Sequence, residues 1–157
     1  MARHPSLVPL SHDHHHGLAL ALRCRKQALG RIKPLGIQGL KERAQEFKEF
    51  FTARLTPHFA VEETVLFPFL RSSVPESGPL IEALLAEHGQ LRSWLERLED
   101  ENHLAKLLFE AADLLERHIR REERELFPLF EARAASAEAE SVGKKIHQMI
   151  KHEHKHE

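Results

Sequence analysis

The chain has 157 residues, enough for one domain with a real core, and its 23 basic and 24 acidic side chains nearly cancel. Because both signs are interspersed, no basic stripe could follow a nucleic-acid backbone, and nucleic acid is not an expected partner. A single cysteine, Cys24, excludes an internal disulfide, and the lack of a membrane-spanning run or an apolar leader favours a cytoplasmic location.

Four long stretches carry apolar residues at helical spacing, and the first runs from about residue 12 to 31. Glycines and prolines then predict a turn before a second helix at about 38–71. Pro57 and Pro68 lie inside that helix and should kink it, because proline removes a backbone donor. After a loop, the pattern predicts two more helices, at about 79–99 and 102–133.

Almost no window alternates as a half-buried strand does, so the predicted fold class is all-α. Four long amphipathic helices with short connections are typical of an antiparallel up-and-down four-helix bundle, here over residues 10–133. Residues 134–157 are expected to form a short C-terminal extension, in which an Ala-rich connection leads to a short helix near 142–151. The His-rich charged tail that follows is expected to be disordered rather than to bind metal.

One motif occurs twice, as HFAVEETVLFPFL beginning at His58 and as HIRREERELFPLF beginning at His118. Each copy has two glutamates at the fourth and fifth positions after the histidine, and Leu-Phe-Pro at the eighth to tenth. Residues four apart share one face of a helix, so each histidine can aim at the same point as its partner, Glu62 or Glu122. A carboxylate can bridge two metals, and two facing pairs would hold ions about 3.5–4 Å apart.

Terminal ligands from the other two helices would complete such a site. His88 is the only histidine on the apolar side of the third helix. In the first helix His15 fits best, because Leu18 and Leu22 lie three and seven positions after it. His14 is the alternative. The candidate metal ligands are therefore His15, His58, Glu62, His88, His118 and Glu122.

The second glutamate of each motif, Glu63 or Glu123, is turned by about 100° around the helix from the first. We expect these two side chains to be solvated or to pair with arginines such as Arg120, Arg121 and Arg124. Metal binding should therefore survive the substitution Glu63→Ala.

This pattern resembles the hemerythrin-like (HHE cation-binding) domain over about residues 10–133. The resemblance implies a helix bundle around a non-haem di-iron centre with an oxo or hydroxo bridge, in which each iron receives two histidines and both bridging glutamates, Glu62 and Glu122. Oxygen-carrying members of the family have a further histidine one turn beyond the one on the third helix, where this chain has Arg92. That difference argues against reversible oxygen carriage and favours the family's sensing and iron-repair members.

Together, the residues and the resemblance favour a non-enzymatic protein that binds or senses dioxygen, nitric oxide or iron through two iron ions. A second possibility is a di-iron oxidoreductase that acts on peroxide, or a donor of iron to damaged iron–sulfur centres. A third is a zinc-binding or structural interaction module. A ferritin-type oxidase is disfavoured, because the Glu-x-x-His spacing that it needs occurs only at Glu153 and His156. The expected partners are small molecules, and the sequence identifies no protein partner and no membrane.

Overall fold

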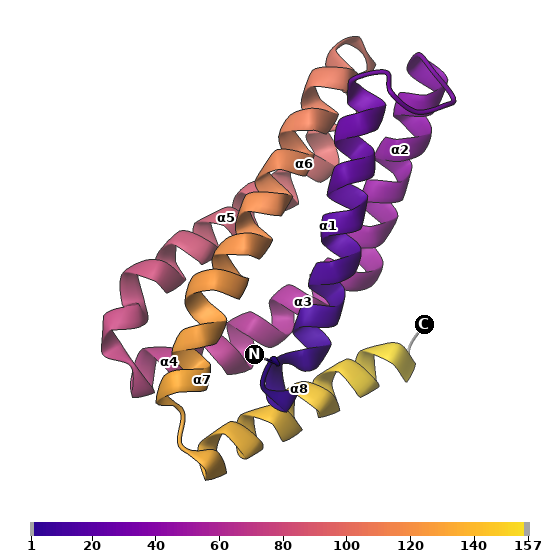
Figure 1. Cartoon of the computed structure of the whole chain (residues 1–157). Helices are drawn as coiled ribbons and strands as arrows, with labels where there is room; N and C mark the ends of the chain where they lie inside the picture. The colour runs from indigo at the N-terminus through magenta and orange to yellow at the C-terminus, as the bar shows by residue number, and fades with distance from the viewer. Residues whose placement is uncertain (1, 156–157) are drawn as a thin grey trace.

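Five helical segments follow one another along the chain in the computed structural model, which describes the backbone of residues 2–155 and the side chains of residues 2–150 (Figure 1). The first segment is α1 and the third is α5, which cover Val8–Ala28 and Gly78–Arg97. The second segment consists of α2 (Ile37–Phe50), α3 (Thr56–Val61) and α4 (Phe67–Ser73). The fourth segment consists of α6 (Leu104–Arg121) and α7 (Phe127–Arg133), and the fifth is α8 (Ser136–Lys155). The predicted all-α class is confirmed, since residues 2–155 contain no strand.

Three π-helical turns interrupt stretches that the sequence predicts as single helices. They cover Phe51–Leu55, Glu62–Leu66 and Glu122–Leu126, and a proline follows two residues after the end of each. Proline cannot donate a backbone hydrogen bond, and its ring crowds the carbonyl four residues earlier, so the helix widens there. The ribbon changes direction between α2 and α3, near the first of these prolines (Figure 1). The helical backbone nevertheless continues through all three.

Two apolar clusters fill the interior, and a layer of histidine and glutamate side chains lies between them. On α5, for example, Leu84 belongs to one cluster and Leu91 to the other, with the fully buried His88 between them. The same order of apolar, polar and apolar residues recurs along α1 and across the π-helical turns that begin at Glu62 and Glu122. The polar layer is therefore covered by apolar packing on both sides.

The C-terminal segment differs from its prediction, because the Ala-rich stretch expected as a connection is helical from Ser136 onward. Ala139, Val142 and Ile146 are buried on one face of α8, within the apolar cluster nearest the N-terminus of α1. Helix α8 crosses one end of the other segments in Figure 1 and contacts α3. Alanine is the strongest helix former, which explains why this stretch is helical. The three apolar residues on one face then pack it against the rest of the chain.

The charged tail is expected to be disordered rather than to bind metal, but the side chains of its histidines, His152, His154 and His156, lie outside the described part of the structure. Within the part of the chain that the structure covers, no helix is both long enough and apolar enough to cross a membrane.

Candidate metal centre

Six ionisable side chains meet in the polar layer, and each is no more than 2 % exposed. They are His14 on α1, His58 on α3, His88 on α5, His118 on α6, and Glu62 and Glu122 at the first positions of two π-helical turns. Five of these six residues are predicted from the sequence. The structure brings all five together and replaces the sixth, His15, with its neighbour.

The carboxylate of Glu62 faces two histidines from different helices. Its Oε2 lies 3.3 Å from His58 Nε2, and its Oε1 lies 3.1 Å from His88 Nε2. One side chain therefore offers a separate oxygen to each of two imidazoles.

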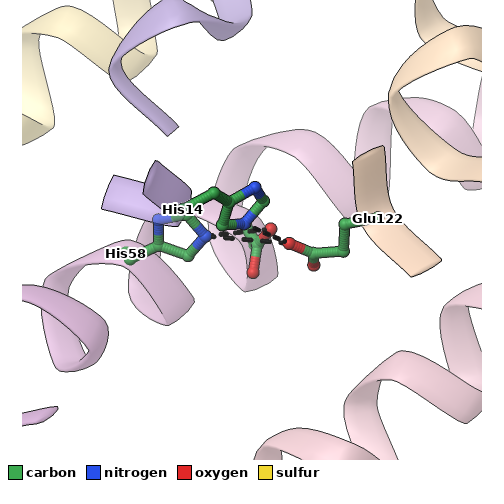
Figure 2. A group of neighbouring side chains, drawn as sticks. His14, His58 and Glu122 are labelled. Carbon is green, nitrogen blue, oxygen red and sulfur yellow. Dashed lines mark hydrogen bonds and ion pairs between the residues drawn. The ribbon is translucent and has the colours of Figure 1, made fainter. Parts of the chain in front are cut away.

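The carboxylate of Glu122 likewise faces histidines from different helices. Its Oε1 lies 2.9 Å from His14 Nε2 and 3.7 Å from His58 Nε2, and its Oε2 lies 3.5 Å from His118 Nε2. Figure 2 shows His14, His58 and Glu122 pointing toward one another. Two groups of four potential ligands result, His14, His58, Glu62 and Glu122 in one, and Glu62, His88, His118 and Glu122 in the other. The two carboxylates are common to both groups.

Six atoms that point into this layer have no hydrogen-bond partner among the described residues. They are His58 Nε2, His88 Nε2, His118 Nε2, both carboxylate oxygens of Glu62, and Glu122 Oε2. Each buried polar atom without a partner costs about 1–3 kcal/mol, so six of them close together indicate that something else binds here. Imidazole nitrogen and carboxylate oxygen are together suitable ligands for iron, manganese and zinc. The residues present thus fit a pair of metal ions.

A second set of carboxylates holds the other nitrogen of each histidine ring. The distances from Nδ1 to the carboxylate oxygen are 2.6 Å for His14 and Glu123, 3.1 Å for His58 and Asp13, 2.6 Å for His88 and Glu63, and 2.8 Å for His118 and Glu87. Because an ionised carboxylate can only accept, Nδ1 carries the hydrogen and donates it. That tautomer leaves the inward Nε2 free to bind a metal, and the same contact fixes the orientation of the ring.

The prediction that Glu63 and Glu123 are solvated or paired with arginines is confirmed in part, since each side chain is partly exposed and pairs with an arginine, Arg92 or Arg3. What the prediction misses is that each carboxylate also holds a histidine of the buried layer. A one-residue step does turn each side chain away from the inward ligand before it, but the turn directs the carboxylate to a histidine on the next helix. Glu63 also accepts a hydrogen bond from Arg92, and Glu123 accepts one from Arg3 and one from Ser11 Oγ. Asp13 and Glu87 have the same role and are not predicted from the sequence.

The prediction of His15 on the first helix is also corrected, because α1 presents His14 to the layer and exposes His15. Leu22, on which the choice of His15 depended, is 46 % exposed. The buried face of α1 beyond the layer is formed largely by small residues, among them Gly17, Ala21 and Cys24. A Cβ atom on Gly17 would lie 2.7 Å from Ile119 Cδ1, so the glycine allows α1 to approach α6 closely.

Arg92 stands one turn after His88, at the position where the resemblance to oxygen-carrying hemerythrins implies an additional histidine. Its guanidinium donates to Glu63 Oε2 at 3.0 Å and lies 5.5 Å from the centroid of the Phe59 ring. The side chain is 47 % exposed. Arg92 therefore supports the carboxylate that holds His88 and is not itself part of the buried layer.

The buried groups strongly shift one another's protonation. Burial acts to raise the pKa of Glu122, but the charge of His118 and the hydrogen bond from His14 outweigh it and hold that pKa well below its usual range. Burial acts to lower the pKa of His58, but the carboxylates around it, Glu62 foremost, outweigh burial and place that pKa well above 6.5. The pKa values of His14 and His88 are raised for the same reason. In the absence of metal the layer therefore favours the protonated forms of His14, His58 and His88.

Comparison with protein families gives one match that bears on this site. The family model described as the hemerythrin HHE cation binding domain matches residues 7–130. The matched range includes all six side chains of the buried layer and ends before α8. No curated protein and no solved structure matches the chain.

Proposed function

Since the chain belongs to the hemerythrin HHE cation-binding domain family, we propose that its buried layer holds a non-haem pair of iron ions within an antiparallel up-and-down bundle of four long helical segments. One observation carries the proposal, namely that two buried carboxylates are shared by two pairs of histidines. Glu62 and Glu122 would bridge the ions. One ion would take His14 and His58, and the other His88 and His118.

The chain's own residues would prepare this site for a small ligand. The outer carboxylates hold each Nδ1 hydrogen and so keep each Nε2 directed inward. Phe59 stacks on the His88 ring with centroids 3.7 Å apart, and Phe127 stacks on His14 at 5.4 Å. These rings exclude water, and unpaired charge is costly to bury in such surroundings, which favours a small neutral molecule over a charged organic substrate. A bound iron pair would supply reversible redox change and open coordination positions.

We therefore propose that the protein binds or senses dioxygen or nitric oxide, or buffers iron, and that it is not primarily an enzyme. Arg92 lies outside the buried layer and offers no extra ligand, so the two metal positions have matched sets of two histidines and two shared carboxylates. The family's oxygen carriers have one ligand more. Sensing or iron buffering fits this smaller ligand set better than oxygen transport does.

Metal analysis of protein produced with added iron tests the di-iron proposal. We expect two iron ions per chain and the near-ultraviolet absorption of a ferric pair. Glu62→Ala or Glu122→Ala should remove most of the iron, whereas Glu125→Ala, an exposed position in the same turn as Glu122, should not. Zinc in place of iron, or no stoichiometric metal, would contradict the proposal and favour a zinc-binding or structural module.

Rapid mixing of the reduced protein with oxygen or nitric oxide tests the assigned role. A spectral change that reverses when the gas is removed would support ligand binding or sensing. Sustained turnover of peroxide would instead favour an oxidoreductase. Transfer of iron to an added acceptor protein would favour an iron donor.

A further inference from the structure

Two exposed histidines of α1, His12 and His16, form a pair that belongs to neither group of buried ligands. They are four residues apart and therefore lie one turn apart on the same face of the helix. Their Nε2 atoms are 3.3 Å apart, and the rings meet edge to face with centroids 4.8 Å apart. The two Nε2 atoms are thus already close together, although both side chains are at the surface.

The separation of the two nitrogens matches the geometry of a shared metal ion. Two imidazole nitrogens, each bound at about 2.0–2.1 Å to one tetrahedral ion, lie about 3.3–3.4 Å apart. Two histidines four residues apart on a helix are also the spacing that helical zinc sites use. A hydrogen bond between two neutral rings would give a similar distance between the two nitrogens. In that case one Nε2 carries a hydrogen, whereas a metal ion binds only when both Nε2 atoms are unprotonated, so the two arrangements differ in the tautomer of one ring.

The pair also lies beside a route toward the buried layer. His12 lines a pocket of about 300 Å³ whose wall is mainly apolar and includes Ile150 of α8. The same pocket reaches Asp13 and His58, where Asp13 Oδ2 accepts the hydrogen bond from His58 Nδ1. An ion held at His12 would therefore stand beside the pocket that leads to a histidine of the buried layer.

We propose that His12 and His16 form a second, exposed metal site that binds one divalent transition-metal ion through two imidazole nitrogens. Solvent completes the coordination, and the two-nitrogen set selects imidazole-binding ions such as Zn²⁺ and Cu²⁺ over Mg²⁺ and Ca²⁺, which prefer oxygen. The site would hold such an ion next to the pocket that reaches His58. Its ligands are separate from those of the buried pair, so it does not depend on the function proposed for that pair.

Titration of the full chain with Zn²⁺, followed by NMR of its ¹⁵N-labelled histidine rings, tests this proposal. The Nε2 signals of His12 and His16 should shift together and saturate with a single ion. In His12→Ala, binding at His16 should weaken by about a hundredfold, because the second imidazole acts at a high effective concentration. His15→Ala is the matched control, because His15 is exposed on the same stretch of α1 and should leave both signals unchanged.

Several results would overturn the proposal. It fails if His12 and His16 do not shift at Zn²⁺ concentrations that saturate other surface sites, or if His15→Ala weakens binding as much as His12→Ala does. A variant with alanine at His152, His154 and His156 tests the other histidine-rich stretch of the sequence. If the His12 and His16 signals no longer respond to Zn²⁺ in that variant, the site belongs to the C-terminal histidines instead.

Discussion

At the scale of single residues, the four outer carboxylates connect the helices in a closed ring. Each one directly precedes or follows an inward ligand in the sequence, yet it binds a histidine on a different helix. Asp13 of α1 holds His58 of α3, Glu63 holds His88 of α5, Glu87 of α5 holds His118 of α6, and Glu123 holds His14 of α1. The order returns to its starting helix, so the position of every histidine depends on its neighbours.

This ring predicts that removing the charge of one outer carboxylate weakens metal binding without removing a ligand. Glu63→Gln or Glu123→Gln should lower metal affinity about 10- to 100-fold, because a neutral amide accepts the Nδ1 hydrogen of His88 or His14 more weakly than a carboxylate and can also turn its NH2 group toward the ring. Competition against a coloured chelator measures the change. Glu125→Gln is the matched control, because Glu125 is largely exposed. Equal affinities for all three variants and the unmodified chain would show that the outer carboxylates do not position the ligands.

The first helix allows a second test at the same scale, with adjacent histidines as the variant and its control. His14→Ala should sharply reduce the amount of bound iron, because it removes a buried Nε2 that faces Glu122. His15→Ala should leave the iron content unchanged, because that side chain is exposed. Elemental analysis of the two purified variants decides between them, and the opposite pattern would restore the assignment made from the sequence.

Most of the buried layer is predictable from the sequence because the repeated motif fixes both the residue types and their spacing. The ligand on α1 is not predictable in this way. The large apolar residues Leu18 and Leu22 share a face with His15, so they suggest that this face is buried, whereas the buried face of α1 carries smaller residues. The close approach of α1 to α6 requires small residues such as Gly17, and these mark the buried face. The outer carboxylates are harder to predict, since helical period gives the direction of Glu63 from its own helix but not which helix lies there.

At the scale of secondary-structure elements, α8 is the part whose contribution to stability is easiest to measure. Ile146 is fully buried within the apolar cluster at the end of the bundle. Ile146→Ala should lower the free energy of unfolding by about 2–5 kcal/mol, the usual cost of such a truncation in a core. Denaturant unfolding measures it, with the exposed Gln148→Ala as the control. A change below about 0.5 kcal/mol, as at ordinary surface positions, would mean that α8 is not part of the cooperative fold.

The long helices are predictable because their apolar period is strong, and the interruptions within them are only partly so. Pro57 and Pro68 correctly indicate a disturbance in the second segment, but proline alone does not specify whether a helix breaks, kinks or widens. The tertiary contacts on both sides of each proline keep the chain helical here. In α8 the opposite problem occurs, because its alanines and exposed charges give too weak an apolar period to reveal that it docks.

At the scale of the whole molecule, the buried layer links metal content to stability. Without metal, the buried carboxylates and imidazoles face only one another, six of their atoms make no hydrogen bond to a described residue, and the desolvation of so many ionisable groups in one layer opposes folding. A metal that binds only the folded chain stabilises it by about 2.7 kcal/mol when its free concentration is 100 times Kd. Removing the metal with a chelator should therefore lower Tm, and adding iron back should restore it. An unchanged Tm would indicate that the layer is not loaded.

The size of that stabilisation should depend on pH. The raised pKa of His58 means that the metal-free fold gains stability from this group below about pH 6.5 and loses it as pH rises through the folded-state pKa. Metal binding needs the unprotonated ring, so affinity increases over the same range. The difference in Tm between iron-loaded and metal-free protein should therefore widen as pH rises. Thermal melts at several pH values measure it, and a constant difference would argue against protonated histidines in the metal-free layer.

The π-helical turns beside the layer also act as one-residue phase shifts in the sequence. In such a turn the hydrogen bond closes one residue later than in an α-helix, as from Phe67 N–H to the carbonyl of Glu62. Later apolar positions are therefore delayed by one, which is why Leu66 and Phe67 are both buried. Deleting the exposed Thr64 should therefore restore a regular α-helical turn and leave the residues after it on the same face, because the wide turn takes up the extra residue. Each copy of Leu-Phe-Pro thus stands where a wide turn ends, and the turn lets the chain carry one residue more between a buried glutamate and the apolar cluster below it without changing the face that this cluster presents.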